Sequence, residues 1–276
     1  TAQVRFGLRT EHLAALTTAQ VEALTTAQVA QGLTNEHIGQ GLSTTQLVAM
    51  ETRDIAALTT AQVKLGLTTD QIVALTTAQV VALSAAQIGQ GLSEVQVAAF
   101  ETGDIGVLTT SQIAQGMTTA QVAALTTAQV QQGLTTAQIA QGLSTAQVAA
   151  LETQDVAVLT TAGVSALTTA QVSLGLNTRQ VVALTPVQVN LGLTTTQVVA
   201  LTTAQVAALT TAQLAQGMST AQMVILSTAQ AAALTGTQLA QGLSTAQVAV
   251  METQDIAALT TASVAAMTTS QVNLGL

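Results

Sequence analysis

Four pairs of acidic residues recur along the chain and are its most regular chemical feature. Each pair opens a repeat of the form Glu-Thr-X-Asp, as in ETRDIAAL. The pairs are Glu51 and Asp54, Glu101 and Asp104, Glu152 and Asp155, and Glu252 and Asp255. Proteins bind calcium through carboxylate and other oxygen ligands, so each pair is a weak candidate for a calcium site.

A second interpretation of these pairs needs no metal. Acidic side chains near a helix N-terminus are stabilised by the helix dipole, and they keep an otherwise neutral surface soluble. The pairs stand 50, 51 and 100 residues apart. If successive pairs lie about two helix layers, or roughly 20 Å, apart, two pairs cannot share one ion. This spacing favours the second interpretation.

Two histidines form the other candidate for a metal site. His12 and His37 lie 25 residues apart, and each directly follows a glutamate, Glu11 or Glu36. Imidazole and carboxylate groups bind divalent transition metals, so these residues are a weak candidate site. The alternative, which we favour, is that each histidine replaces the glutamine of other repeats at an exposed helix start.

The remaining polar residues do not predict an enzyme. Serine and threonine are abundant, but they fall at helix-capping positions, and a nucleophile needs an oriented base beside it. The glycines are spaced by the repeat and do not form a phosphate-binding GxGxxG motif. We therefore predict neither catalysis nor a cofactor.

The composition argues against two classes of partner. Only 7% of the residues are charged and the formal net charge is −8, whereas binding to a nucleic-acid backbone needs clustered lysine and arginine. No run of 18 apolar residues exists, so no membrane insertion is predicted. The apolar share is still 49% with 1% aromatic residues, which predicts a core of alanine, valine, leucine and isoleucine.

A repeat that runs through the whole sequence must position all of these residues. From Arg9 to Leu276 the chain divides into 32 repeats, 20 of eight residues and 12 of nine, typified by TTAQVAAL and TTAQVQQGL. No linker or change of composition interrupts the series, so we expect residues 1–276 to form a single continuous array. Neither end shows the polar capping repeat that solenoids need, so we expect a segment of a longer chain.

Each repeat carries a signal for starting a helix. Its first Thr is suited to be the N-cap, and the Gln three positions later, present in 24 of the 32 repeats, completes a capping box. The Leu that ends one repeat and the Val at the fifth position of the next form a hydrophobic staple. Gly133, in a nine-residue repeat, is expected to end its helix in the left-handed conformation. Pro186 follows the predicted cap Thr185 at the first helical position, which suits proline.

The spacing of the glycine-containing repeats predicts how the helices stack. Helices of five to seven residues are stable only when neighbours pack on them, because isolated helices need about 12–15 residues. The glycine-containing repeats that begin at Thr34, Thr59, Ser84 and Thr109 are 25 residues apart, or two eight-residue repeats and one of nine. The predicted fold is therefore all-α, a solenoid of very short capped helices with about three repeats per 25-residue coil, where a coil is one turn of the solenoid. A β-solenoid is the alternative, disfavoured by the alanine, glutamine and leucine content and by the lack of strict alternation.

The Leu-Thr-Thr-Ala-Gln-Val/Ile repeat resembles tracts in very large proteobacterial secreted or surface proteins, often labelled adhesin-like or haem utilisation or adhesion proteins. The resemblance covers the whole chain. It implies export, an extracellular or cell-surface location, and a role as a stalk or filament. The residues give the haem label little support, because so short a repeat leaves no evident cavity for a macrocycle and the chain has only two histidines.

Together these observations predict a structural protein. We expect a rigid extracellular rod or filament that associates with itself end to end or laterally. With about 10 Å for each helix layer, a stack of about 11 coils would have a length on the order of 110 Å. The alternative is a binding module that presents a repetitive Thr-rich face to a glycan, ice or another protein.

Overall fold

Every element that the computed structural model describes is a short helix. The structure describes residue 2 and residues 7–275. The chain forms two compact units, Thr1–Leu143 and Ser144–Leu276, which we call the N-terminal and C-terminal units. Both consist of the same helical repeat, so the predicted all-α class is confirmed. That one array runs unbroken through both units stays a prediction.

The helices correspond one to one with the repeats, and most nine-residue repeats contain a π-helix, labelled η. The N-terminal unit contains α2 (Thr10–Ala14), α3 (Thr18–Glu22), α4 (Thr26–Gly32), η1 (His37–Gly41), α5 (Thr44–Ala49), α6 (Thr52–Ala57), α7 (Thr60–Gly66), α8 (Thr69–Ala74), α9 (Thr77–Ala82), η2 (Gln87–Gly91), α10 (Glu94–Ala99), α11 (Thr102–Val107), η3 (Gln112–Gly116), α12 (Thr119–Ala123), η4 (Gln129–Gly133) and η5 (Gln138–Gly142). The C-terminal unit contains α13 (Thr145–Ala150), α14 (Thr153–Val158), α15 (Thr161–Ala166), η6 (Gln171–Gly175), α16 (Thr178–Ala183), η7 (Gln188–Gly192), α17 (Thr195–Ala200), α18 (Thr203–Ala208), η8 (Gln213–Gly217), α19 (Thr220–Val224), α20 (Thr228–Ala232), η9 (Gln238–Gly242), α21 (Thr245–Ala249), α22 (Thr253–Ala258), α23 (Thr261–Ala266) and α24 (Thr269–Gly275). None of these helices has the length and apolar character that crossing a lipid bilayer requires.

The predicted capping box is present, as the start of α12 shows. The Thr118 N–H donates to Gln121 Oε1 (2.8 Å), and the Gln121 N–H donates to Thr118 Oγ1 (3.2 Å). These bonds satisfy two N–H groups that a helix start otherwise leaves unpaired. The same two bonds join Thr185 and Gln188 (2.7 and 3.1 Å). They place Pro186 at the first position after the cap, as predicted.

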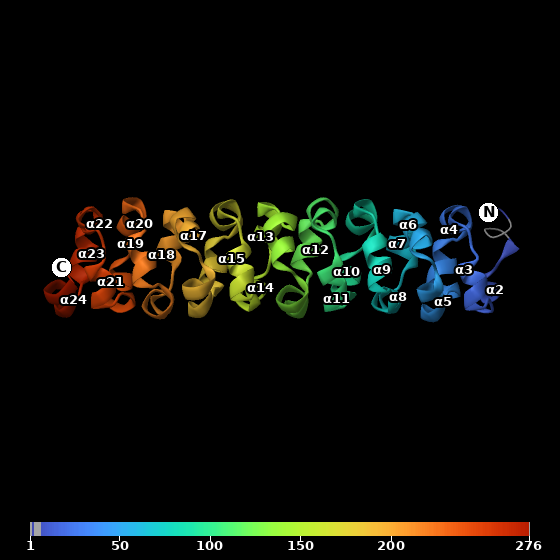
Figure 1. Ribbon diagram of the computed structural model, residues 1–276, viewed down its shortest axis with the longest axis horizontal. Coiled ribbons are helices and arrows are strands. Elements are labelled where there is room, and N and C mark those ends of the chain that lie inside the picture. The colour runs from blue at the N-terminus through green and yellow to red at the C-terminus, as the bar shows by residue number, and fades with distance from the viewer. Residues whose placement is uncertain (1, 3–6, 276) are drawn as a thin grey trace. The chain divides into compact units, whose positions relative to one another are not determined.

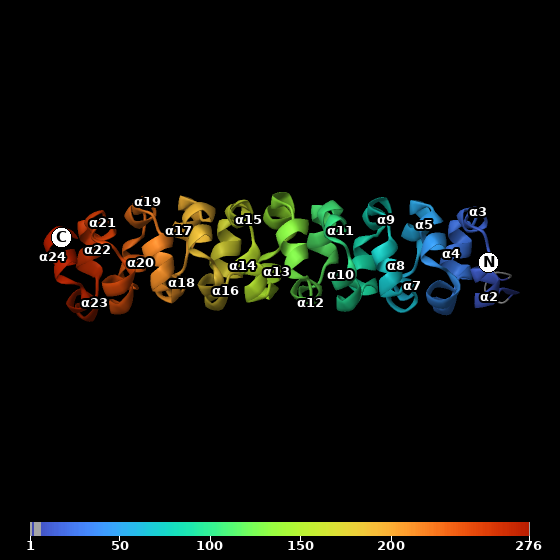
Figure 2. The same cartoon turned by 90° about the horizontal axis from the view of Figure 1, so that it is seen from below.

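The helices stack with a period of three repeats. In the N-terminal unit, α2 packs on η1, α3 on α5 and α4 on α6, and in the C-terminal unit α16 packs on α18 and α18 on α20. Each partner lies three repeats further along the chain. Within each unit, Figures 1 and 2 show short helices following one another around a coil, with coil stacked on coil. The predicted coil of about three repeats is confirmed.

Two apolar positions in most repeats make up the core. The fifth and the last residue of these repeats are buried, as are Val122 (0% exposed) and Leu125 (4%) in the repeat of α12, whereas Val264 and Val272, the fifth residues of the last two repeats, are exposed. The last residue of one repeat precedes the cap of the next, so these positions are the two members of the predicted hydrophobic staple. Burying one such side chain contributes about 1.5–3 kcal/mol. The short helices obtain this stabilisation only by packing against neighbouring coils.

A wider final turn accommodates the additional residue of the nine-residue repeats. The Leu134 N–H donates to the carbonyl of Gln129, five residues back (2.9 Å). In an eight-residue repeat the Leu125 N–H donates to the carbonyl of Val122, three residues back (3.2 Å). The prediction of a left-handed Gly133 is wrong, because no described glycine has a positive φ.

The close approach of two coils is what requires glycine at Gly133. A Cβ atom there would lie 2.9 Å from the carbonyl oxygen of Thr102 and 3.0 Å from the Cβ of Ile105. Both atoms belong to α11, on which η4 packs. Contacts this short are repulsive in a close-packed interior. The absence of a side chain therefore allows the two layers to approach.

Candidate functional site

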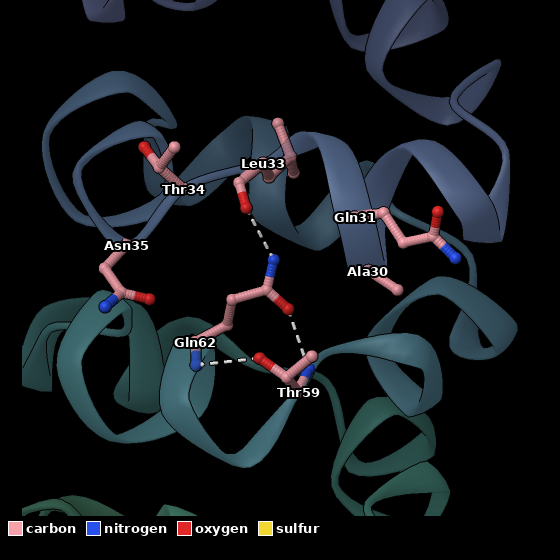
Figure 3. Close-up of a pocket in the computed structure, with 7 residues that line it drawn as sticks. All are labelled: Ala30, Gln31, Leu33, Thr34, Asn35, Thr59 and Gln62. Carbon is pink, nitrogen blue, oxygen red and sulfur yellow. Dashed lines mark hydrogen bonds between the residues drawn. The ribbon is translucent and has the colours of Figure 1, made fainter. Parts of the chain in front are cut away.

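A single glutamine side chain caps its own helix and joins it to the preceding coil. Gln62 Oε1 accepts from the Thr59 N–H (2.7 Å), and the Gln62 N–H donates to Thr59 Oγ1 (3.2 Å). Gln62 Nε2 donates to the carbonyls of Leu33 (2.7 Å) and Val29 (2.8 Å). Figure 3 shows the amide of Gln62 reaching from its own cap to the carbonyl of Leu33. The four hydrogen-bonding groups of the capping box are thus paired with one another, and the side-chain amide N–H groups of Gln62 are paired with the preceding coil.

The same side chain recurs throughout both units and forms what we call the glutamine ladder. Each Nε2 donates to main-chain carbonyls at the end of the fourth repeat back, typically those of its fifth and last residues. The ladder is Gln46, Gln62, Gln71, Gln79, Gln87, Gln96, Gln112, Gln121, Gln129 and Gln138 in the N-terminal unit, and Gln180, Gln188, Gln197, Gln205, Gln213, Gln222, Gln230, Gln238, Gln247 and Gln271 in the C-terminal unit. All of these side chains are buried. The expectation that the box position is an exposed helix start is therefore wrong for the internal coils.

The sequence contained a signal for this role. Glutamate completes a capping box as well as glutamine does, yet none of the 32 repeats has glutamate at the box position. A glutamate side chain has no N–H group to donate to a carbonyl. The exclusion of glutamate thus indicates a donor function that capping alone does not explain.

His37 takes the place of a ladder glutamine. Its side chain is 6% exposed; Nδ1 accepts from the Thr34 N–H (3.2 Å), and Nε2 lies 3.1 Å from the carbonyl oxygen of Leu8. With the proton on Nε2, the ring reproduces both functions of the glutamine amide. Neither ring nitrogen is left for a metal. The structure therefore gives the predicted His12 and His37 metal site no support.

His12 lies in the first described coil and is exposed. Its Nδ1 accepts from the Arg9 N–H (3.2 Å), and Glu11 forms an ion pair with Arg9 (3.1 Å). Over residues 7–275, no three or more histidine, cysteine, aspartate or glutamate side chains gather where they could hold a metal ion. His12 thus acts in its own capping box.

The acidic pairs divide into a buried and an accessible member. The box aspartates are almost fully buried, with exposed fractions of 0% for Asp54, 3% for Asp104, 0% for Asp155 and 1% for Asp255. The cap glutamates Glu101, Glu152 and Glu252 are exposed, and Glu51 is half-buried. Calcium takes six to eight oxygen ligands, and each pair supplies two carboxylates, one of them inside the core. The geometry adds no further acidic ligand to the predicted calcium sites.

Burial changes the acid–base behaviour of three of these aspartates. Desolvation raises the pKa of Asp155 to about 6; a hydrogen bond from the Glu152 N–H opposes the rise, and the charge of Glu152 adds to it. The pKa of Asp104 is raised by the same causes in the same order. Burial also raises the pKa of Asp54, against the lowering effect of the Arg53 charge. These carboxyls accept a proton more readily than an exposed aspartate does.

An open groove of about 510 Å³ lies beside Gln62. Its lining is largely polar and includes Gln31, Thr34, Asn35 and Thr59, which Figure 3 shows around the gap between two coils. The lining holds no acid, base or histidine, so the groove has no group suited to proton transfer. The hydrogen-bonding capacity of the site is directed at the chain's own backbone.

A profile of the ALTTAQ repeat matches residues 1–35, 97–132, 148–186 and 248–274. The chain is a Thr/Ala/Gln repeat protein. A comparison with curated proteins found no match. Among solved structures, the leucine-rich repeat-containing protein LegL7 from Legionella pneumophila is similar at 12% identity over 82% of this chain and 83% of that chain, with a TM-score of 0.24. Similarity this weak carries no argument, so the solenoid assignment rests on the packing of the short helical repeats described above.

Proposed function

We propose that this chain is a structural repeat protein, a rigid rod or filament component at the cell surface or outside the cell, and not an enzyme. The observation that carries the proposal is the glutamine ladder. A buried side chain with bonds both to its own helix start and to the preceding coil stiffens the contact between coils, because each bond lost would leave a buried carbonyl unpaired. Rigidity along the stack is the property that a stalk or filament needs.

Association with further copies is part of the proposal. The ladder glutamines already bond to the preceding coil, as Gln62 and Gln121 do. In the first described coil Gln20 makes its hydrogen bonds inside its own repeat, so its amide donors are suited to the carbonyls of a coil of another copy. The low share of charged residues, 7%, means that little charge repulsion opposes such contacts. The extracellular setting rests on the resemblance of the repeat to tracts of large secreted and surface proteins.

A binding module is the second candidate, and one observation favours it. The first Thr of a repeat uses its hydroxyl as the cap, as Thr118 does, but the second Thr, such as Thr119, is exposed. A surface bearing such a hydroxyl in most repeats is regular enough to recognise a glycan, ice or another repetitive partner. A glycan array and an ice-recrystallisation assay separate this candidate from a purely structural role.

Electron microscopy of the purified chain at neutral pH, with and without calcium, tests the proposal. Filaments with a layer repeat of about 10 Å support a self-assembling fibre, and single rods support a spacer. Filaments that form only with calcium would assign the acidic pairs to calcium-dependent assembly. Compact, roughly spherical particles in both conditions would refute the rod.

A further inference from the structure

Four repeats interrupt the glutamine ladder with a buried aspartate. Asp54, Asp104, Asp155 and Asp255 stand at the box position. An aspartate side chain is one methylene shorter than glutamine and, when ionised, accepts hydrogen bonds only. It can still replace the acceptor half of the glutamine amide: Asp104 Oδ2 accepts from the Glu101 N–H (3.1 Å). The donor half has no equivalent in the ionised form.

The groups opposite these carboxylates are oxygens. Ladder glutamines donate to the fifth and last carbonyls of the fourth repeat back, as Gln62 does to Val29 and Leu33. In the same register, Asp54 faces the repeat that contains Val21 and Leu24. In the part of the chain that is described, both carboxylate oxygens of Asp54 and Oδ1 of Asp155 and Asp255 are buried without a hydrogen-bond partner. Burying an ionised carboxylate in this way is strongly unfavourable.

No buried cation neutralises Asp54. Its helix α6 packs on α4 and α9, neither of which contains an ionisable residue. Arg53 is largely exposed and binds Glu51 (2.7 Å). The repeat opposite Asp54 contributes only Glu22, an exposed acid.

The surroundings of the next two aspartates are similar. The helix of Asp104, α11, packs on α9 and η4, which contain no ionisable residue, and the repeat opposite contributes only the exposed Asp70. The helix of Asp155, α14, packs on α16, whose single charged residue, Arg179, is exposed. Thus α9 and η4 place no positive charge beside Asp104, and α16 places no buried positive charge beside Asp155.

We propose that Asp54, Asp104 and Asp155 are held as carboxylic acids in the folded chain, with the acid O–H of Asp54 and of Asp104 replacing the glutamine amide as the donor to the preceding coil. The contact between coils at Asp54 and Asp104 is then controlled by pH. Protonation provides the donor, and ionisation places a carboxylate against carbonyl oxygens. Asp54 and Asp104 lie six repeats, and thus two coils, apart on the same side of the N-terminal unit. Ionisation therefore loosens that side at two levels.

The raised pKa values of these groups give the direction of the effect. A group whose pKa is higher in the folded than in the unfolded chain stabilises the fold at pH values below the unfolded pKa of about 3.9. That contribution is lost as the pH rises through the folded pKa, which is about 6 for Asp155. A difference of about two units corresponds to a roughly 100-fold fall in the folding equilibrium constant from Asp155. The chain is thus more stable in mild acid than at neutral pH.

The test compares the wild type with the triple variant D54N/D104N/D155N in urea unfolding at a series of pH values from about 4 to about 7.5. Asparagine keeps an N–H donor at every pH. We expect the folding equilibrium constant of the wild type to fall with rising pH and that of the triple variant to change far less. D70N, at an exposed aspartate in a first helical turn, is the matched control and should keep the wild-type profile. Identical profiles for the wild type and the triple variant would overturn the proposal.

Carbon NMR of the aspartate carboxyls in the wild type decides the matter even if the triple variant does not fold. We expect the buried carboxyls to titrate clearly above the ordinary value of about 3.9, and midpoints near that value would overturn the proposal. Unfolding at neutral pH with added calcium tests whether a cation takes the place of the proton. If calcium does not change the stability, the result supports protonated carboxyls as the donors. A calcium-induced gain in the wild type that the triple variant lacks would assign the bridging role to a cation and refute the proposal.

Discussion

Replacing Gln121 with alanine isolates the contribution of the ladder to stability. Gln121 is 2% exposed, and its Nε2 donates to the carbonyls of Ile88 and Leu92 at 2.7 Å each. Gln121→Ala removes these two bonds, the capping box with Thr118, and the apolar contacts of the side chain. The matched control is Gln20→Ala. Gln20 makes the same box with Thr17 (2.8 and 3.3 Å), but it is exposed in the first described coil and its hydrogen bonds lie inside its own repeat.

The difference between the two variants gives the energy of the contact between coils. Loss of a helix cap costs about 1 kcal/mol in both variants. Gln121→Ala also loses two hydrogen bonds of roughly 1 kcal/mol net each, and each buried carbonyl left unpaired adds up to about 1–3 kcal/mol. We therefore expect Gln121→Ala to lower the free energy of unfolding by about 2–5 kcal/mol more than Gln20→Ala does.

Urea unfolding followed by circular dichroism measures this difference, and amide hydrogen exchange shows where the chain opens. The amides of α10 and α12 should lose protection first in Gln121→Ala, because repeat proteins open by breaking contacts between neighbouring layers. Equal destabilisation by the two substitutions, within about 0.5 kcal/mol, would refute the reasoning. It would mean that the capping box accounts for the whole role of the glutamine.

Three further predictions concern single positions. Val122→Asp should lower the free energy of unfolding by several kcal/mol, because Val122 is fully buried and the introduced charge has no partner. Thr119→Ser, at an exposed position, should leave the stability nearly unchanged. Thermal melts that show equal tolerance at the two positions would mean that the buried face is misassigned. Gly133→Ala should destabilise the chain by about 1–3 kcal/mol through the short contacts with α11. Gly103→Ala, where a Cβ meets nothing within 4 Å, should stabilise it by up to about 1 kcal/mol. Urea unfolding measures both changes, and unchanged stability of Gly133→Ala would contradict the close approach of the two layers. In the same assay His37→Gln should keep near wild-type stability, because glutamine supplies the acceptor and the donor that the imidazole supplies in the wild type. His37→Ala should lose stability. Similar losses in both variants would contradict the view that His37 acts as a ladder glutamine does.

The local part of this fold was predictable, and the contacts between coils were not. The capping box lies within four residues, so the register of every helix follows from Thr118 and Gln121 and their equivalents alone. The 25-residue interval between glycine-containing repeats gives the coil. The acceptors of the ladder glutamines, in contrast, lie 28 to 33 residues back, and nothing inside a repeat points to them. A single repeat therefore predicts an exposed helix start for its glutamine and not the contact with the preceding coil.

The role of glycine and the burial of aspartate were missed for the same reason. Gly133 is suited by its type to end a helix, and the atoms that exclude a Cβ belong to α11, three repeats earlier. Asp54 is suited by its type to a helix N-terminus in water, and the coil that covers it is likewise remote in sequence. In a stacked fold, polar residues at helix starts are enclosed by neighbouring layers, which the properties of one short helix do not reveal.

The glutamine ladder also bears on how such a gene changes in copy number. Because the donors and acceptors are the same in most repeats, loss or gain of one whole repeat pairs each later glutamine with a different repeat that offers the same two carbonyls. Layers of different kinds are already compatible, since η4 packs on α11 and η6 on α13. Gain or loss of whole repeats is therefore compatible with the fold, whereas loss of a residue between the cap and the box glutamine, as between Thr118 and Gln121, breaks a capping box. Natural selection can adjust the reach of such a protein one helix at a time.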